Sequence, residues 1–287
     1  MGHVAFSHEG EAAIERETGS HEELGEKVLK NSQLGDILKQ QFAAKEISDL
    51  ACGKKLGCLI ASDLGSDRMD YLKRDSHYTG VAYGVIDSSR LIHTLNFSKG
   101  KLLLEKGGLE AAEALLIARF LMFSTVYLHK TVRIASGMLQ EAMRLAVSSG
   151  ALSPVDAVKL DDSQMLSVLK KDKDAAKFVE RLQKRELYKV AHRFNPSPNA
   201  NLLELRKKIA SSAGVNPADV LMESGGKPTK KFDITVLTSS GEKNIEELSQ
   251  LVSAVISAEE TRRKTLVAAP REKVEAVKKA CEKEFGS

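Results

Sequence analysis

The sequence of 287 residues contains no tryptophan, only six prolines and only three cysteines. Because Cys52, Cys58 and Cys281 are odd in number and form no Cys-x-x-Cys pair, we expect neither a disulfide framework nor a structural zinc site. No stretch reaches the roughly 18 apolar residues of a membrane-spanning helix, and the first residues lack the apolar region of a secretory signal. We therefore expect a cytoplasmic protein with reduced thiols and no membrane contact.

The chain also has little excess charge and lacks several common enzyme motifs. Lysine and arginine exceed aspartate and glutamate by only 43 to 39, and the charges are interspersed, which gives little support to a nucleic-acid-binding helical protein. There is no Walker phosphate loop, no Gly-x-Ser-x-Gly elbow and no His-Glu-x-x-His sequence. These absences remove several common enzyme classes.

Helical periodicity dominates the first two thirds of the chain, which is 42% apolar overall and long enough to bury a large core. Ser20, with Glu23 at the capping-box position, predicts a helix that runs to about residue 31. The stretch 109–147 is apolar nearly all round in its first half, so it predicts the longest helix, at the centre of the core. Further helices are predicted at 34–42, 47–52, 56–64, 66–80, 163–169 and 175–191, whereas 85–95 and 102–104 are compatible with strands or with helical turns.

Residues 195–199, Asn-Pro-Ser-Pro-Asn, form the clearest linker, and the pattern changes after it. Alternation at 232–238 and a short apolar run at 265–268 predict strands. Helices are predicted around them at 202–213, at 245–257 and from Pro270 to about 285. We therefore predict a mainly α protein, with a helical domain at 1–194 followed by a small α+β lobe at 200–287.

The predicted helix 66–80 carries an unusual polar face. At about 100° per residue it brings two carboxylates, a phenol and a guanidinium together. These side chains belong to Asp67, Arg68, Tyr71 and Asp75. Such a face suits a pocket that holds a cation, a ribose and phosphates. The alternative is a solvated helix in which Asp70 and Arg74 form an i,i+4 pair, and spacing alone favours this alternative.

Histidine is concentrated at the start of the chain. Three of the seven histidines, His3, His8 and His21, fall within the first 21 positions, and Glu11 lies between them. Imidazoles are the usual choice for metal ligation and for proton transfer near neutral pH. Taken singly, each histidine is more often a surface residue than a catalyst, so the clustering is suggestive but generic.

The apolar stretch 109–147 contains a charged residue that needs explanation. Arg119 and Tyr127 lie eight positions apart, nearly on one helical face, and His129 and Lys130 follow. A charged arginine in so apolar a helix needs an anionic ligand, a carboxylate partner or access to the surface. The spacing leaves all three open.

In this order the motifs resemble those of the HD-domain phosphohydrolases, and most of all the branch that includes the deoxynucleoside triphosphate triphosphohydrolases. The resemblance covers the helical domain to about residue 190 and extends weakly into the C-terminal lobe, and it implies an HD-type helical core. The motifs are Gly2-His3-x-x-Phe6-Ser7-His8, Ser20-His21-Glu22, Asp-Arg-x-Asp-Tyr-x-x-Arg-Asp at 67–75, and Arg119 with Tyr127-x-His129-Lys130.

The resemblance implies a role for each of these residues. Asp67 matches the last ligand of a divalent metal, which in the family is Mn, Mg, Fe, Ni or Zn. His8 and His21 match catalytic histidines that work on the phosphate, with Glu11 as an acidic partner that orients an imidazole. The implied substrate-binding residues are His3, Arg68 and Arg119 for the phosphates, Tyr71, Asp75 and Tyr127 for the sugar or base, and Lys130, beside His129, for a regulatory nucleotide.

The chain departs from the family at the metal site. The family motif reads His-Asp-x-Gly-His, and Met1 occupies the x, so the metal-binding His-Asp pair would fall before the first residue; an earlier histidine ligand is also absent. A single carboxylate such as Asp67 does not hold a transition metal tightly. Either an internal methionine has been taken as the start of a longer protein, which we favour, or this shorter chain has lost hydrolysis. A native mass no greater than 31.3 kDa would contradict truncation.

We therefore expect a metal-dependent phosphohydrolase whose substrate is a nucleotide, in the first place a deoxynucleoside triphosphate, or another phosphate ester, and we expect a homo-oligomer. The alternative is a non-catalytic protein in which Arg119, Tyr127 and Lys130 bind a nucleotide that controls assembly. Thermal-shift titration with nucleotides separates the two hypotheses, because stabilisation that ignores metal favours binding alone.

We predict that the chain of 287 residues is nearly inactive, because it lacks most of the metal ligands of the family. Incubation with dGTP and Mn²⁺, followed by measurement of the released triphosphate, tests this expectation. Robust release would contradict it.

Overall fold

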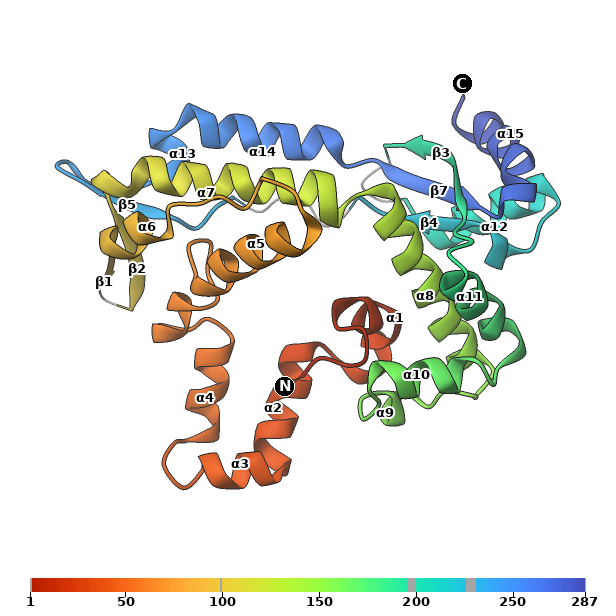
Figure 1. Cartoon of the computed structure of the whole chain (residues 1–287), viewed down its shortest axis with the longest axis horizontal. Coiled ribbons are helices and arrows are strands. Elements are labelled where there is room, and N and C mark those ends of the chain that lie inside the picture. The colour runs from red at the N-terminus through yellow and green to blue at the C-terminus, as the bar shows by residue number, and fades with distance from the viewer. Residues whose placement is uncertain (1, 99, 196–199, 226–230, 287) are drawn as a thin grey trace. The chain divides into compact units, whose positions relative to one another are not determined.

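The structure is a computed structural model that describes residues 2–98, 100–195, 200–225 and 231–286 (Figure 1). The chain forms two compact units, and each of them combines segments that are distant in the sequence. The first unit consists of Met1–Val28, His129–Gly226 and Arg263–Ser287, and the second unit consists of Leu29–Leu128 and Lys227–Arg262. The sequence that follows the predicted linker therefore contributes to both units. Residues 196–199 of that linker lie outside the described residues.

The fold is mainly α with small sheets, as the sequence predicts. The helices of the first unit are α1 (His8–Thr18), α2 (His21–Asn31, whose last residues fall in the second unit), α8 (Lys130–Ser148), α9 (Pro154–Ala157), α10 (Asp162–Leu169), α11 (Lys173–Gln183), α12 (Leu202–Ala213) and α15 (Val274–Phe285), with short 3₁₀ helices at Pro217–Asp219 and Arg271–Lys273. Its strands are β3 (Lys189–Phe194), β4 (Leu221–Glu223) and β7 (Thr265–Ala269).

The second unit contains the remaining described elements. Its helices are α3 (Gln33–Leu38), α4 (Ala44–Ala51), α5 (Ser66–Thr79), α6 (Ser88–Thr94), α7 (Leu109–Met122), α13 (Ile245–Leu248) and α14 (Gln250–Arg262), with 3₁₀ helices at Lys55–Leu59 and Lys106–Gly108 and a π-helical turn at Phe123–Tyr127. Its strands are β1 (Leu95–Ser98), β2 (Lys101–Glu105), β5 (Thr235–Thr238) and β6 (Gly241–Asn244).

The first unit has a helical part and a sheet part. In the helical part, α1 and α11 pack on α8, and Ile14 and Met138 are fully buried in the core between them. In the sheet part, β7 lies between β3 and β4 and pairs antiparallel with both (Figure 1). All five residues of β7 are buried, which explains why the strand reads as a continuous apolar run. Helices α12 and α15 pack together beside this sheet.

The helix predicted at 175–191 is wrong over its second half. Helix α11 ends at Gln183, and Arg185 adopts a left-handed conformation with φ 57°, which the helix cannot continue through. Residues Lys189–Phe194 then form β3, whose backbone pairs with β7. A partner strand about 75 positions away in the sequence decides this element, so local periodicity does not reveal it.

The second unit is built around α7. This helix packs against α14, α5 and α6 (Figure 1). Its residues Ala112, Leu115 and Leu116 are completely buried. The neighbouring sheet has the strand order β1-β2-β5-β6, in which β2 and β5 are parallel and the other pairs antiparallel. Because α7 is buried on several sides, its sequence is apolar nearly all round.

Two long predicted helices are interrupted. The helix predicted at 109–147 is wrong as a single element: α7 ends at Met122, a π-helical turn follows, and α8 begins at Lys130. The side chain of His129 caps α8 by accepting a hydrogen bond from the backbone N–H of Thr131 at 3.3 Å. The helix predicted at 245–257 is likewise divided into α13 and α14 at Ser249. In both places the apolar pattern continues across the break.

Several other predictions are confirmed. The helix at 202–213 coincides with α12, and the helix predicted at 66–80 corresponds to α5, which ends at Gly80 in a left-handed conformation. The Ser20 hydroxyl accepts a hydrogen bond from the backbone N–H of Glu23, and the Glu23 carboxylate accepts one from that of Ser20, so the capping box of α2 is formed. The strand predicted at 232–238 is present but shorter, as β5. Pro270, expected inside the last helix, directly precedes the 3₁₀ turn that leads into α15.

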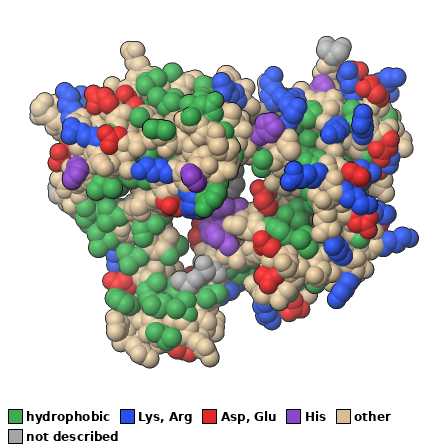
Figure 2. Space-filling model, in the orientation of Figure 1, with side chains coloured by type: hydrophobic (Ala, Val, Ile, Leu, Met, Phe, Trp, Pro, Cys, Tyr) green, Lys and Arg blue, Asp and Glu red, His purple; other side chains and the backbone are tan. Residues whose placement is uncertain are grey.

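Among the described residues, no single helix is long and apolar enough to cross a membrane, although the bent pair Lys106–Tyr127 and Lys130–Ser148 reaches the required length and hydropathy when the two are taken together. Charged side chains of both signs are interspersed on the face shown in Figure 2, in keeping with the near balance of charge in the sequence.

We predict that Leu72→Ala lowers the free energy of unfolding by about 2–5 kcal/mol, because it leaves a cavity where a fully buried side chain of α5 packs in the second core. Urea denaturation followed by circular dichroism measures this effect. Val85→Ala is the matched control: Val85 is 82% exposed in the same unit, so its truncation should change stability by less than about 0.5 kcal/mol. Equal effects of the two substitutions would contradict the assignment of Leu72 to the core.

Candidate functional site

The first unit gathers three imidazoles and one carboxylate around the start of the chain. One donor atom from each of His3, His8, Glu11 and His21 lies within 4.8 Å of the donor atoms of the other three. The ring centre of His3 lies 4.6 Å from that of His8 and 4.6 Å from that of His21, and the His8 and His21 centres are 5.1 Å apart. We call these four residues the histidine cluster. The structure thus brings together four residues to which the resemblance gave separate roles.

A strained turn, a hydrogen bond to α10 and a close approach at Gly2 hold the cluster together. Phe6 and Ser7 both adopt left-handed conformations, with φ 60° and 53°, and this turn leads directly into α1 at His8. The backbone N–H of Phe6 donates to Oδ1 of Asp162 at 2.8 Å, which holds the turn against α10. A Cβ on Gly2 would lie 1.8 Å from the carbonyl oxygen of His21, so only glycine lets the segment before His3 run this close to α2.

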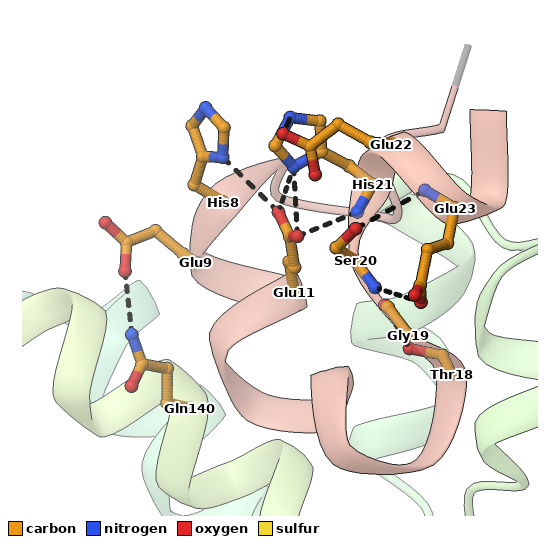
Figure 3. Close-up of polar contacts among 10 residues, drawn as sticks. All are labelled: His8, Glu9, Glu11, Thr18, Gly19, Ser20, His21, Glu22, Glu23 and Gln140. Carbon is orange, nitrogen blue, oxygen red and sulfur yellow. Dashed lines mark hydrogen bonds and ion pairs between the residues drawn. The ribbon is translucent and has the colours of Figure 1, made fainter. Parts of the chain in front are cut away.

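Glu11 is the centre of the hydrogen bonds in the cluster (Figure 3). Its carboxylate accepts from the backbone N–H of His21 at 2.8 Å, and both of its oxygens lie 2.9 Å from Nδ1 of the His21 ring. Nδ1 of His8 lies 3.4 Å from Oε2 of Glu11. Because an ionised carboxylate only accepts hydrogen bonds, these contacts place a proton on Nδ1 of His21.

The electrostatics of the cluster favour an ionised Glu11 and a neutral His3. Burial opposes ionisation of Glu11, but the hydrogen bonds from the backbone and ring of His21 and from His8 outweigh burial and lower the pKa of its carboxyl group. Burial, together with the nearby positive charges that His8 and His21 can carry, lowers the pKa of His3. The cluster is accessible, because the side chain of His8 is 70% exposed, and histidine side chains gather at the surface in Figure 2.

A hydrogen bond from the neighbouring helix anchors α1 beside the cluster. Nε2 of Gln140, a buried residue of α8, donates to Oε2 of Glu9 at 2.8 Å (Figure 3). Sequence reasoning missed both Gln140 and Asp162, which position the cluster. No sequence signal could have found them, because each is an ordinary polar residue that acts across more than 130 positions.

In the second unit, the polar face of α5 meets the end of the π-helical turn. The hydroxyl of Tyr127 donates to Oδ2 of Asp75 at 2.6 Å, and the rings of Tyr71 and Tyr127 meet edge to face with their centres 6.2 Å apart. Burial and the hydrogen bond to Asp75 raise the pKa of Tyr127. Three residues expected to contact a sugar or base therefore lie together within this unit, and their roles stay predictions.

The two arginines expected to bind phosphate both have carboxylate partners. Nη1 of Arg119 lies 3.1 Å from Oε1 of Glu259, and its guanidinium lies over the ring of Phe123. Arg68 pairs with Asp63 at 2.5 Å. The carboxylate partner that the sequence left open for Arg119 is thus present within the second unit.

Asp67, the predicted metal ligand, also belongs to the second unit and accepts a hydrogen bond from the backbone N–H of Arg68 at 2.6 Å. Among the described residues, no group of three or more candidate metal donors includes Asp67.

Lys130 is exposed at the start of α8 in the first unit. Asp70 and Arg74 form the ion pair of the solvated-helix alternative. The solvated-helix alternative therefore holds for the side of α5 that carries Asp70 and Arg74. The side that carries Tyr71 and Asp75 contacts Tyr127 instead.

Sequence reasoning also missed Glu223, a half-buried residue of β4 in the first unit. Burial raises the pKa of its carboxyl group from 4.5 to about 7; the positive charges of Arg144 and Arg133 oppose this shift, and the negative charges of Glu9 and Glu141 add to it. Glu223 lines a cavity of about 420 Å³. A strand of three residues gives no pattern from which this burial could be read.

We predict that Glu223→Gln changes the pH dependence of stability. In the folded protein Glu223 keeps its proton up to about pH 7, whereas the unfolded chain loses it near pH 4.5, so this group makes the free energy of unfolding fall as the pH rises between these values. The glutamine variant should lack this fall and should be the more stable protein above pH 7. Urea denaturation across this pH range measures the difference. Glu15→Gln, an exposed residue of the same cavity, should follow the wild-type profile; parallel profiles for wild type and Glu223→Gln would contradict the account.

The sequence of this chain is similar to a known family and to proteins of other organisms. A family model described as HD associated region matches residues 86–286. An uncharacterized protein of Methanocaldococcus jannaschii is 30% identical over 97% of this chain and 63% of its own length, and the uncharacterized protein YwfO of Bacillus subtilis is 26% identical over 92% of this chain and 69% of its own. The chain thus spans less than two thirds of the archaeal relative.

Solved structures show the same fold. A hypothetical protein from Aquifex aeolicus superposes with a TM-score of 0.75 at 30% identity, covering 98% of this chain and 76% of the other. A phosphohydrolase from Bacteroides thetaiotaomicron superposes with a TM-score of 0.70 at 25% identity, covering 94% of this chain and 77% of the other. These matches confirm the resemblance at the level of the HD superfamily, whereas the deoxynucleoside triphosphate branch stays a prediction.

Proposed function

The chain belongs to the HD-associated family, and on that premise we propose that it takes part in the hydrolysis of a phosphate ester of a nucleotide. The observation that carries the proposal is the arrangement of Glu11 between the rings of His8 and His21. A carboxylate that orients one imidazole beside a second, solvent-exposed imidazole is equipped for proton transfer to and from a phosphate ester.

Each member of this arrangement has a chemical task. Glu11 holds Nδ1 of His21 and approaches Nδ1 of His8, so the Nε2 atoms are left to face other groups. His8 has the more exposed side chain, 70% against 32% for His21, and its Nε2 can donate a proton to a leaving oxygen. His3 can donate a hydrogen bond to a non-bridging oxygen and so neutralise developing charge.

A divalent metal supplies, when bound in enzymes of this kind, a Lewis acid for the phosphate and an activated water. The described surroundings of Asp67 do not provide the three or four donors that such a metal needs. The proposed reaction therefore has no step that uses a metal bound at Asp67. In the second unit we propose Tyr71, Asp75 and Tyr127 as contacts to the sugar or base of a nucleotide, and Arg68 and Arg119 as phosphate ligands that would exchange carboxylate partners for substrate.

The test is a long incubation of concentrated protein with deoxynucleoside triphosphates and Mn²⁺, with the phosphate products measured against a protein-free control. We predict slow release that depends on the histidine cluster: His8→Gln and Glu11→Gln should each lower the rate about tenfold or more, toward background, because general acid–base catalysis contributes about 10²–10⁴-fold.

His93→Gln is the matched control, since His93 is an exposed histidine of α6 outside the cluster and should leave the rate unchanged. Release that survives both cluster substitutions would show that the cluster is not the catalytic group and would overturn the proposal.

A further inference from the structure

We propose that the histidine cluster is itself a binding site for one divalent transition-metal ion, held by His3, His8, His21 and Glu11 within the first unit and without a ligand from Asp67. This inference does not rest on the proposed hydrolysis, because metal binding can be measured whether or not the chain cuts any substrate. It differs from the metal site that the resemblance implies, of which Asp67 is the surviving residue.

The donor set suits a borderline transition metal. Three imidazole nitrogens and one carboxylate oxygen match the ligands and the coordination number that Zn²⁺ prefers in proteins, and Co²⁺ and Ni²⁺ bind the same groups. Soft thiolates are absent from the four residues, which disfavours Cu⁺, and a single carboxylate is a poor site for Ca²⁺ or Mg²⁺. The cluster therefore selects the metals that bind imidazole.

The distances from Glu11 to two of the imidazoles are close to those in a tetrahedral site. Metal–nitrogen bonds of about 2.1 Å at a tetrahedral angle put neighbouring donors roughly 3.4 Å apart. Oε2 of Glu11 lies 2.9 Å from Nδ1 of His21 and 3.4 Å from Nδ1 of His8. A metal ion would thus replace the protons between Glu11 and these two rings with little movement. A nitrogen of His3, within 4.8 Å of the other donors, completes the set after a rotation of its side chain.

An outer carboxylate stands behind one of the predicted ligands. If His21 binds through Nδ1, its Nε2 carries the proton, and Oε1 of Glu22 lies 3.4 Å from that nitrogen. Metal-bound histidines commonly donate their second N–H to a carboxylate, which fixes the ring and strengthens the ligand. Glu22 is the residue in that position here, in the first turn of α2.

The backbone positions the ligands before any metal arrives. The turn at Phe6 and Ser7 is fixed by Asp162, α1 is anchored by the bond from Gln140 to Glu9, and Gly2 lets the segment of His3 lie against α2. Preorganised ligands lose little conformational entropy on binding. Three imidazoles this close also repel one another when protonated, whereas a metal ion binds all three in their neutral form.

Metal and proton compete for the same Nδ1 atoms. The cluster can therefore work as a hydrogen-bonded acid–base group or hold a metal, but His8 and His21 cannot do both through these atoms at once. Excess Zn²⁺ should accordingly inhibit any hydrolysis that depends on the cluster.

Equilibrium dialysis and calorimetric titration of the tag-free protein, cleared of metal with EDTA, test the inference. We expect one Zn²⁺ per chain. Co²⁺ should give the visible absorption of a tetrahedral complex. His8→Gln and Glu11→Gln should each weaken binding by tenfold or more, and Glu22→Gln should weaken it by about 10–100-fold if the outer carboxylate orients His21. Because His8 is largely exposed, its substitution leaves the packing intact and keeps the test valid if Glu11→Gln fails to fold.

Asp67→Asn and His93→Gln are the matched controls, and both should bind Zn²⁺ as the wild type does. Absence of a stoichiometric site in the wild-type protein, unchanged affinity in His8→Gln, or loss of binding in Asp67→Asn would each overturn the inference. If the wild-type protein binds no Zn²⁺ but its hydrolysis still depends on the histidine cluster, the metal site alone is refuted. If it binds Zn²⁺ but hydrolyses no nucleotide, the proposed function alone is refuted.

Discussion

The contact between the carboxylate of Glu11 and His21 is the interaction on which the candidate site depends. The Glu11 side chain is only 11% exposed, and a carboxylate so far from water must be compensated by hydrogen-bond donors. The donors here are the backbone N–H of His21, the His21 ring and, at longer range, the His8 ring. The hydrogen bonds that compensate the carboxylate of Glu11 therefore also fix the positions of the His21 and His8 rings. Glu11 thus stabilises this part of the fold and orients the candidate catalytic rings.

The rest of the first unit supports that contact. The left-handed turn at Phe6 and Ser7 costs free energy of order 1–3 kcal/mol for each such residue, and it persists because the surrounding contacts determine it. Asp162 and Gln140 supply two of those contacts from α10 and α8. Strain at a turn that aims a histidine is typical of a functional site. In the second unit, the pairing of Tyr127 with Asp75 ties the π-helical turn to α5 in a similar way.

The sequence predicts what is local and misses what depends on distant partners. The capping box of Ser20 and Glu23 and the helix at 202–213 are set by neighbouring residues, and both were predictable. The first three residues of β3 were predicted as the end of a helix, because only the pairing with β7 makes them a strand. The histidines stood out by composition, but the carboxylate partner of Arg119 lies 140 positions away at Glu259, and the burial of Glu223 depends on the packing of several elements. The spacing of residues in the sequence indicates candidate functional residues but does not predict their contacts.

The central claim is that Glu11 fixes the tautomer and the orientation of His21, and nitrogen-detected NMR of the histidine rings in metal-free protein tests it most directly. The account predicts that His21 carries its proton on Nδ1 and that Glu11→Gln, which removes the charged acceptor, makes the ring a mixture of tautomers. The more exposed His93 should be unaffected. A His21 ring that is protonated on Nε2 in the wild-type protein, or that does not respond to the substitution, would contradict the account.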